Sequence, residues 1–148
     1  MPGQLFKAAA IAGAAEANEI GFLENPVTAL ELHIQAIKNV CDQTGIPIAK
    51  IEGVFSTGWS TELCEHLGIT PKYIDTTAVG GCSFEMHVHH ALAAIHSGII
   101  DVALISHGEN GHSRRKIGGG GSGNYGAGAG ALSPAAEMSM AYGLGGAP

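Results

Sequence analysis

Cys82 is the residue with the clearest chemical reason to react. It lies in the stretch Val-Gly-Gly-Cys-Ser-Phe (residues 79–84), where an apolar run ends, two glycines turn the chain and a helical pattern begins. The partial positive charge and free N–H groups of a helix start stabilise a thiolate, the nucleophilic form of cysteine. We therefore predict Cys82 as a catalytic nucleophile, and burial as a small apolar side chain is the alternative. Cys41 and Cys64 fall on apolar helix faces and are predicted to be packing residues.

Histidines are concentrated just after this cysteine. They are His87, His89, His90 and His96. A zinc helix of the His-Glu-x-x-His type needs two histidines four residues apart and a third ligand, and neither is apparent. The three cysteines also lack the spacing of a thiolate zinc site. We predict no metal site and expect these histidines at a surface or an interface.

Two glycine-containing segments follow the histidines. Residues 121–126 read Gly-x-Gly-x-x-Gly, but they neither leave a predicted strand nor open a helix, as a dinucleotide site requires. A glycine-rich linker is the better interpretation, and no tightly bound cofactor is predicted. The segment Gly108-Glu109-Asn110 follows an apolar run. We expect it at the carboxyl edge of a sheet, where α/β proteins bind ligands.

Apolar runs and amphipathic stretches alternate along the first 110 residues. Strands are predicted at 5–12, 51–55, 73–79 and 99–106, and helices from Asn25-Pro26 to 44, at 60–67 and at 83–97. The order βαβαβαβ predicts an α/β fold, a mainly parallel sheet with helices on both faces. We expect strand 5–12 in the centre of the sheet, and helix 83–97 to be buried.

Composition limits the classes of function. A net charge of −6 argues against a nucleic-acid binder, and no apolar run reaches the roughly 18 residues that span a membrane. The odd cysteine count and the absence of a signal-peptide pattern favour the cytoplasm. Charged residues make up only 14 %, which indicates that much of the surface faces other protein. We predict one α/β domain over 1–112, a glycine-rich loop region over 113–148, and truncation before a C-terminal half.

Three segments together resemble the thiolase superfamily. They are the strand–Gly-Gly-Cys-Ser–helix unit, the helix end Ala-Ile-His-Ser-Gly, and Asp-Val-Ala-Leu-Ile-Ser-His-Gly-Glu at 101–109. Residues 5–112 are most similar to the sterol-carrier-protein-x or lipid-transfer-protein-like thiolases, often described as acetyl-CoA acetyltransferases. The resemblance implies an acyltransferase that forms or cleaves carbon–carbon bonds in coenzyme A thioesters, with Cys82 as nucleophile. It also implies a homodimer joined through strand 73–79.

The chain departs from this family in two ways. Counting at the family's spacing places Gly81 at the nucleophile position, and Phe84 replaces a glycine. Relatives without the cysteine resemble retro-aldol lyases that act on acyl-CoA with a small zinc-ribbon/OB-fold partner. Family members also have a second, similar half, which carries the oxyanion-hole Asn and His and a second cysteine. Three hypotheses therefore stand: a thiolase-like acyltransferase, a retro-aldol lyase, and a non-catalytic dimerisation domain.

Overall fold

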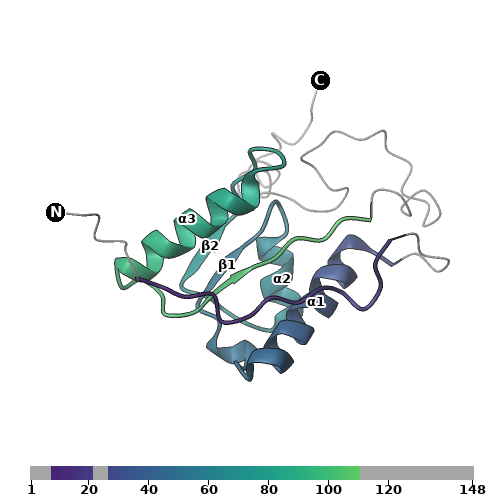
Figure 1. Cartoon of the computed structure of the whole chain (residues 1–148), viewed down its shortest axis with the longest axis horizontal. Coiled ribbons are helices and arrows are strands. Elements are labelled where there is room, and N and C mark those ends of the chain that lie inside the picture. Colours follow the sequence, from purple (N-terminus) through teal and green to yellow (C-terminus); the bar gives the residue numbers. More distant parts are fainter. Residues whose placement is uncertain (1–7, 22–26, 111–148) are drawn as a thin grey trace, which may run out of the picture.

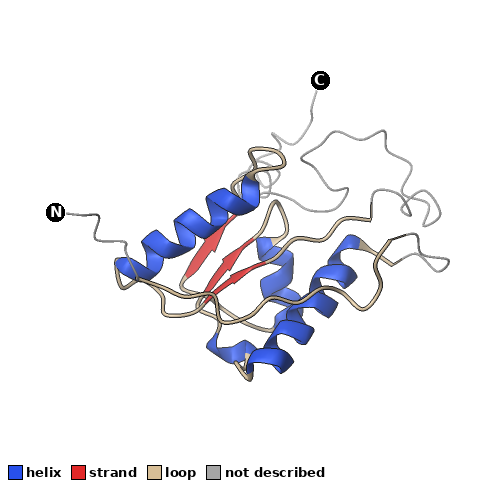
Figure 2. Cartoon of the chain, viewed as in Figure 1, coloured by secondary structure: helices blue, strands red, loops and turns tan. Residues whose placement is uncertain are grey.

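A parallel three-stranded sheet lies at the centre of the described structure (Figures 1 and 2). The computed structural model describes residues 8–21 and 27–110. The strands are β1 (Gly53–Phe55), β2 (Tyr73–Asp75) and β3 (Ala103–Ile105). Their order is β2-β1-β3, and both neighbouring pairs are parallel. The α/β class predicted from the sequence is confirmed.

Helices cover both faces of this sheet. They are α1 (Ala29–Thr44), α2 (Ser60–Leu67) and α3 (Ser83–His96), and a short 3₁₀ turn, η1 (Ile48–Lys50), follows α1. Figure 1 shows α3 on one side of the strands and α1 and α2 on the other. Side chains of a strand alternate between faces. Val54 and Leu104 accordingly pack with α1 and α2, whereas Phe55 packs with α3.

The helix boundaries follow from their caps. The Thr28 side chain accepts the N–H of Glu31, so α1 begins at Ala29. Gly45 and Gly68 end α1 and α2 in the left-handed conformation, at φ values of 69° and 65°. Asn25 and Pro26, where the sequence predicted the helix start, lie outside the described residues. The helix begins three residues after Pro26, with Thr28 as its N-cap.

The prediction of a central strand at 5–12 is wrong for the part that the structure describes. Residues 8–12 form no strand, and Ile11 is 86 % exposed. β1 and β3 pair directly, which leaves no place for a strand between them. Four of residues 8–12 are alanines, which bury little apolar area, whereas the β1–β3 pairing buries Val54 and Leu104.

The prediction that helix 83–97 is buried is also wrong. Ala91 and Ala94 face the sheet and are buried, but Met86 and Val88 are exposed on the outer side. The reason is that one layer of strands covers only one face of α3, and no other described element packs on its outer face. The glycine-rich region 113–148, with the motif at 121–126, lies outside the described residues. No helix within 8–21 and 27–110 is long and apolar enough to cross a membrane.

Candidate functional site at the carboxyl edge of the sheet

Polar residues gather where the three parallel strands end. Ser56 follows β1, Asp75 ends β2, and Ser106 follows β3. Backbone bonds hold these ends together: Ser56 N–H donates to Asp75 O at 3.0 Å and Ser106 N–H to Phe55 O at 3.0 Å. Ligands of open parallel α/β sheets bind at this edge. Gly108-Glu109-Asn110 follows β3 here, as the sequence predicted.

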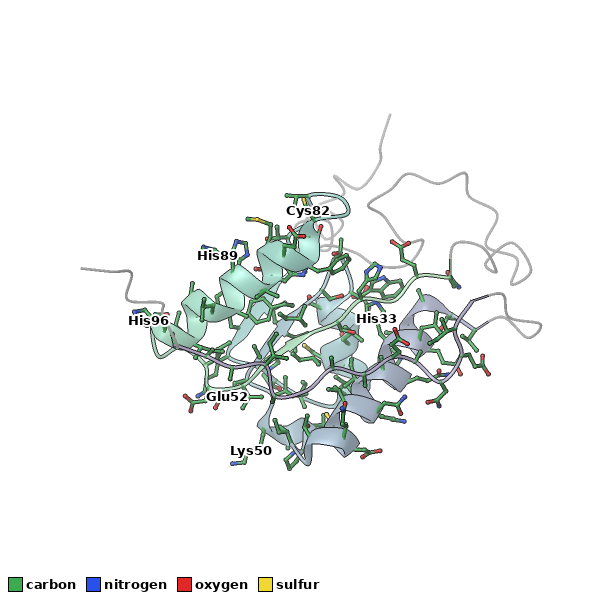
Figure 3. All side chains as sticks on the ribbon, viewed as in Figure 1. His33, Lys50, Glu52, Cys82, His89 and His96 are labelled. Carbon is green, nitrogen blue, oxygen red and sulfur yellow. The ribbon has the colours of Figure 1, made fainter. Side chains whose placement is uncertain are left out.

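His33 of α1 reaches this edge from inside the fold. Its Nδ1 lies 2.7 Å from Ser106 Oγ, and the residue is only 1 % exposed. Burial, and then the nearby His107, lower the pKa of His33 to about 4, so the ring is neutral at pH 7. Its Nε2 is buried and has no hydrogen-bond partner within residues 8–21 and 27–110. Figure 3 shows His33 far from Lys50 and Glu52, which lie at the opposite end of the strands.

Unused hydrogen-bonding capacity is the unusual property of this edge. Four buried side-chain atoms here have no hydrogen-bond partner among the described residues: His33 Nε2, Ser56 Oγ, Thr57 Oγ1 and His87 Nδ1. Ser56 and Thr57 directly follow β1, and the other ring nitrogen of His87 bonds Thr77 O beyond β2 at 3.0 Å. Buried polar groups are ordinarily paired. The edge is therefore equipped to bind a polar ligand or further polypeptide.

An Asp–His pair lies beside this cluster, at the end of β2. Asp75 Oδ2 is 2.6 Å from His90 Nδ1, and Asp75 Oδ1 accepts the Thr77 N–H at 2.7 Å. Burial alone raises the pKa of Asp75, but the hydrogen bonds from Thr77 and His90 outweigh burial and lower it below its usual value. The pair lines a groove of about 570 Å³ between β2 and α3. His90 is half-buried, so part of its ring faces this groove.

Cys82 lies at the start of α3, as the sequence predicted, and its side chain is exposed (Figure 3). Its sulfur is 3.5 Å from Val79 O, and no described side chain that could act as a base bonds it. The turn before it is held by Ser83 Oγ, which accepts the Val79 N–H and donates to Gly80 O. Burial in the core, the alternative for Cys82, does not occur. Its role as a nucleophile stays a prediction.

The other cysteines pack as the sequence predicted. Cys64 is buried and Cys41 is half-buried, both against the α1–α2 side of the sheet. Burial raises the pKa of both thiols. Burial therefore disfavours the reactive thiolate form of both cysteines.

Phe84, where the thiolase pattern has a glycine, contacts the segment after β3. Its ring centroid is 4.2 Å from that of His107, in an edge-on arrangement. This contact ties the start of α3 to the end of β3.

The histidines of α3 divide into two kinds. His89 and His96 are exposed, as predicted, and Figure 3 shows both on α3. His87 is buried and His90 is paired with Asp75, so a surface position is wrong for His87. Burial is the largest cause that lowers the pKa of His87. In the described part of the chain, no three His, Cys, Asp or Glu side chains meet as metal ligands would.

Sequence reasoning missed His33 and the Asp75–His90 pair. His33 did carry a signal, because it lies three residues after Leu30 and four before Ile37, on the apolar face of the helix. A histidine inside an apolar helical stripe is a candidate for burial. Asp75 and His90 are separated by 15 residues, and nothing local in the sequence indicates that they meet.

These features define an α/β protein with a polar carboxyl edge and a groove beside it. No family model matches the chain, and no curated protein matches it. A solved structure, the Ltp2-ChsH2(DUF35) aldolase, matches with a TM-score of 0.56 at 20 % sequence identity. The match covers 83 % of this chain and 31 % of that one, so the chain spans about a third of the length of the solved neighbour. At this identity the likeness is one of fold.

Proposed function

We propose that this chain is the N-terminal part of a carbon–carbon lyase that cleaves 3-hydroxyacyl-coenzyme A thioesters by a retro-aldol reaction. The observation that carries the proposal is the fold shared with a protein described as an aldolase. The thiolase-like sequence segments support a coenzyme A thioester as the substrate. No tightly bound cofactor is part of the proposal.

Retro-aldol cleavage needs groups of the kind that gather at the carboxyl edge. A base takes the proton of the 3-hydroxyl group, and the bond between C2 and C3 breaks to release an aldehyde or ketone. The electron pair forms the thioester enolate, which is stabilised by hydrogen-bond donors and then protonated at C2. No thiolate is needed. Buried hydroxyl groups without a partner among the described residues, those of Ser56 and Thr57, suit such donor roles. The ring of His87 donates from Nε2 to Thr77 O, so its unpaired Nδ1 is an acceptor and not a donor.

An acyltransferase with Cys82 as the nucleophile is the second candidate. The exposed position of Cys82 at the start of α3, after a glycine turn, favours it. In that reaction the thiolate takes the acyl group and releases coenzyme A, and a second acyl-CoA supplies the carbon nucleophile. The absence of a described base bonded to Cys82 favours the lyase instead.

The two candidates separate in one experiment on the complete gene product. It is incubated with a 3-hydroxyacyl-CoA, and the products are identified by mass spectrometry. The lyase releases a carbonyl compound and a shortened acyl-CoA, and Cys82→Ala leaves this activity unchanged. If the reaction is covalent acyl transfer, the rate of the Cys82→Ala variant instead falls by roughly a thousandfold or more. Cys41→Ala is the matched control, because Cys41 packs against the core.

Absence of a carbonyl product, together with acyl transfer that depends on Cys82, overturns the lyase proposal. Absence of both activities favours the third hypothesis, a non-catalytic dimerisation domain. Labelling with iodoacetamide adds an independent measurement. Protection of Cys82 by acyl-CoA supports the acyltransferase, whereas labelling that acyl-CoA does not change supports the lyase.

We also propose that the protein works as an assembly. One contact is a homodimer through the edge of β2 that no other described strand pairs with, where Ile74 is 41 % exposed. The other is with a small protein of the zinc-ribbon/OB-fold kind. The name of the solved neighbour joins two components, Ltp2 and ChsH2(DUF35), which supports a partner for this chain. The low content of charged residues, 14 %, supports extensive contact with other protein.

A further inference from the structure

His107 is an exposed histidine at the carboxyl edge of the sheet, two residues after the end of β3. Its side chain is 42 % exposed, so a ligand at this edge can reach the ring. We propose that His107 is the general base of the lyase and takes the proton of the substrate's 3-hydroxyl group. This inference rests on the proposed function and assigns a catalytic residue to it.

The backbone places His107 next to the buried hydroxyl groups that suit the binding of an oxyanion. The last residues of β1 and β3 are partners in the ladder, and Ser106 N–H donates to Phe55 O at 3.0 Å, so the parallel pairing continues beyond the two strands. Ser56 and Ser106 therefore lie side by side, and Thr57 and His107 follow them. The hydroxyl oxygens of Ser56 and Thr57 are buried without a partner among the described residues. A base beside unpaired donors is the arrangement that retro-aldol cleavage requires.

The residues on both sides of His107 are held against α1. Ser106 Oγ, before it, is 2.7 Å from His33 Nδ1. Gly108, after it, packs so closely on the same ring that a Cβ atom would lie 2.9 Å from His33 Cδ2. An exposed side chain on a fixed backbone keeps its place relative to the substrate, which a general base requires.

The surroundings of the His107 ring suit a group that gains a proton. Phe84 contacts the ring edge-on, at 4.2 Å between centroids, and so restricts its positions. Glu109 Oε1 lies 3.8 Å from Nε2, and a carboxylate at this distance favours the imidazolium that forms on proton transfer. His33, 6.4 Å away between ring centroids, is neutral at pH 7 and therefore does not repel this charge.

The other histidines near the carboxyl edge are less suited to this role. Imidazole is the commonest general base in enzymes, but it must reach the proton that it removes. His33 and His87 are 1 % and 0 % exposed, so a substrate does not reach them in this structure. His90 has one ring nitrogen bonded to Asp75 and lines the groove between β2 and α3. His107 combines exposure with a position beside the unpaired hydroxyl groups.

The proposed reaction moves one proton and breaks one carbon–carbon bond. The proton of the 3-hydroxyl group goes to a ring nitrogen of His107, and the electron pair of the O–H bond completes the new carbonyl group. The bond between C2 and C3 breaks, and its electron pair forms the thioester enolate, whose oxygen the hydroxyl donors stabilise. The imidazolium then returns the proton to C2. The products are an aldehyde or ketone and a shortened acyl-CoA, and no further reactant is consumed.

Steady-state assays of the complete gene product with a 3-hydroxyacyl-CoA test this inference. His107→Ala is expected to lower kcat by roughly a hundredfold or more with little change in KM, because a base acts in the transition state. Imidazole added to the solution is expected to restore part of the activity of this variant, since it can replace the lost ring. His107→Phe keeps an aromatic ring beside Phe84 but has no base, and is expected to be as inactive as His107→Ala.

His96→Ala is the matched control, because His96 is an exposed histidine at the far end of α3. It is expected to keep the wild-type kcat with and without imidazole. The inference is overturned if His107→Phe keeps the activity that His107→Ala loses, since the ring then acts by packing alone. It is also overturned if His107→Ala keeps the wild-type kcat or gains no activity from imidazole. Wild-type protein that releases no carbonyl compound overturns the lyase itself and the base with it. Circular dichroism checks that each variant is folded.

Discussion

His33 is an ionisable side chain that the fold holds in its neutral form. The ring is buried against Ser106 and near His107, with one nitrogen unpaired. Protonation would place a charge in this environment next to a second histidine. The free energy of unfolding must therefore depend on pH through this residue.

Acid is expected to destabilise the protein through His33. Its pKa is about 4 in the folded chain and near 6.5 when exposed, so the unfolded state binds the proton first. The stabilisation is fully present above about pH 6.5 and falls as the pH decreases toward 4, by about 3 kcal/mol. Urea unfolding of wild type and His33→Gln between pH 7 and pH 4.5 measures this loss. If the free energy of unfolding falls equally with pH in the two proteins, the prediction is contradicted.

At the scale of elements, the segment after β3 contacts the first turns of α1 and the residues just before this helix. Ser106 bonds His33, Gly108 packs against His33, and Asn110 Nδ2 donates to Val27 O at 2.9 Å. A Cβ atom at Gly108 would lie 2.9 Å from His33 Cδ2 and 3.1 Å from the backbone oxygen of Ala29. Glycine is required here because the backbone approaches the helix so closely.

Gly108→Ala is expected to destabilise the protein by about 1–3 kcal/mol, because a buried ring and a helix carbonyl must move. Gly81→Ala is the matched control. A Cβ atom at Gly81 meets nothing within 4 Å, so its cost is expected to stay within about 0.5 kcal/mol. Thermal unfolding of both variants gives the comparison. Equal stabilities would show that the β3 segment does not need its close contact with α1.

A buried hydroxyl of α2 hydrogen-bonds the ends of two strands, in addition to the apolar packing of this helix on the sheet. Ser60 Oγ donates to Asp75 O at 2.8 Å and is also 3.2 Å from Ser56 O, so it bridges the ends of β1 and β2. Ser60→Ala is expected to cost about 1 kcal/mol, since both carbonyls lose a bond in a buried place. Ser97→Ala removes an exposed hydroxyl that bonds its own helix and is expected to be nearly neutral. Urea midpoints of the two variants distinguish these outcomes.

At the scale of the whole molecule, two apolar clusters lie on opposite faces of one narrow sheet. β1 contributes to both, because Val54 faces α1 and α2 while Phe55 faces α3. Both side chains are fully buried. A defect on either face therefore weakens the central strand that the two clusters share, and the described domain should unfold as one unit.

Phe55→Ala is expected to lower the free energy of unfolding by about 3–5 kcal/mol in a single transition. Val88→Ala serves as the control, because Val88 is 49 % exposed on the outer side of α3 and its loss should cost little. Far-ultraviolet circular dichroism reports on the helices of both faces together, whereas Trp59 fluorescence reports on the α1–α2 face, because Trp59 packs with that cluster. Two separate transitions would show that the faces unfold independently.

Periodicity in the sequence was enough to predict the helices and the parallel orientation of the three observed strands, but not their order in the sheet. The spacing of apolar residues and the glycines that end each helix are local signals, and α2 was predicted to the residue. The position of Cys82 at the start of α3 follows from the same signals. The prediction of a strand at 5–12 was wrong because an alanine-rich run is apolar but buries little area. Which run takes the central place in the sheet depends on how much area each candidate strand buries there.

The candidate site required the tertiary structure. His33 meets Ser106 across 73 residues, and Asp75 meets His90 across a loop and two turns of helix. Burial and pairing of these groups depend on how helices pack over strand ends, which local sequence does not encode. The sequence by itself determined the α/β class, the helices and the position of Cys82 at a helix start, whereas the exposure of this cysteine came from the structure. Packing alone decided which polar atoms are buried without partners, because desolvation is a property of the three-dimensional surroundings.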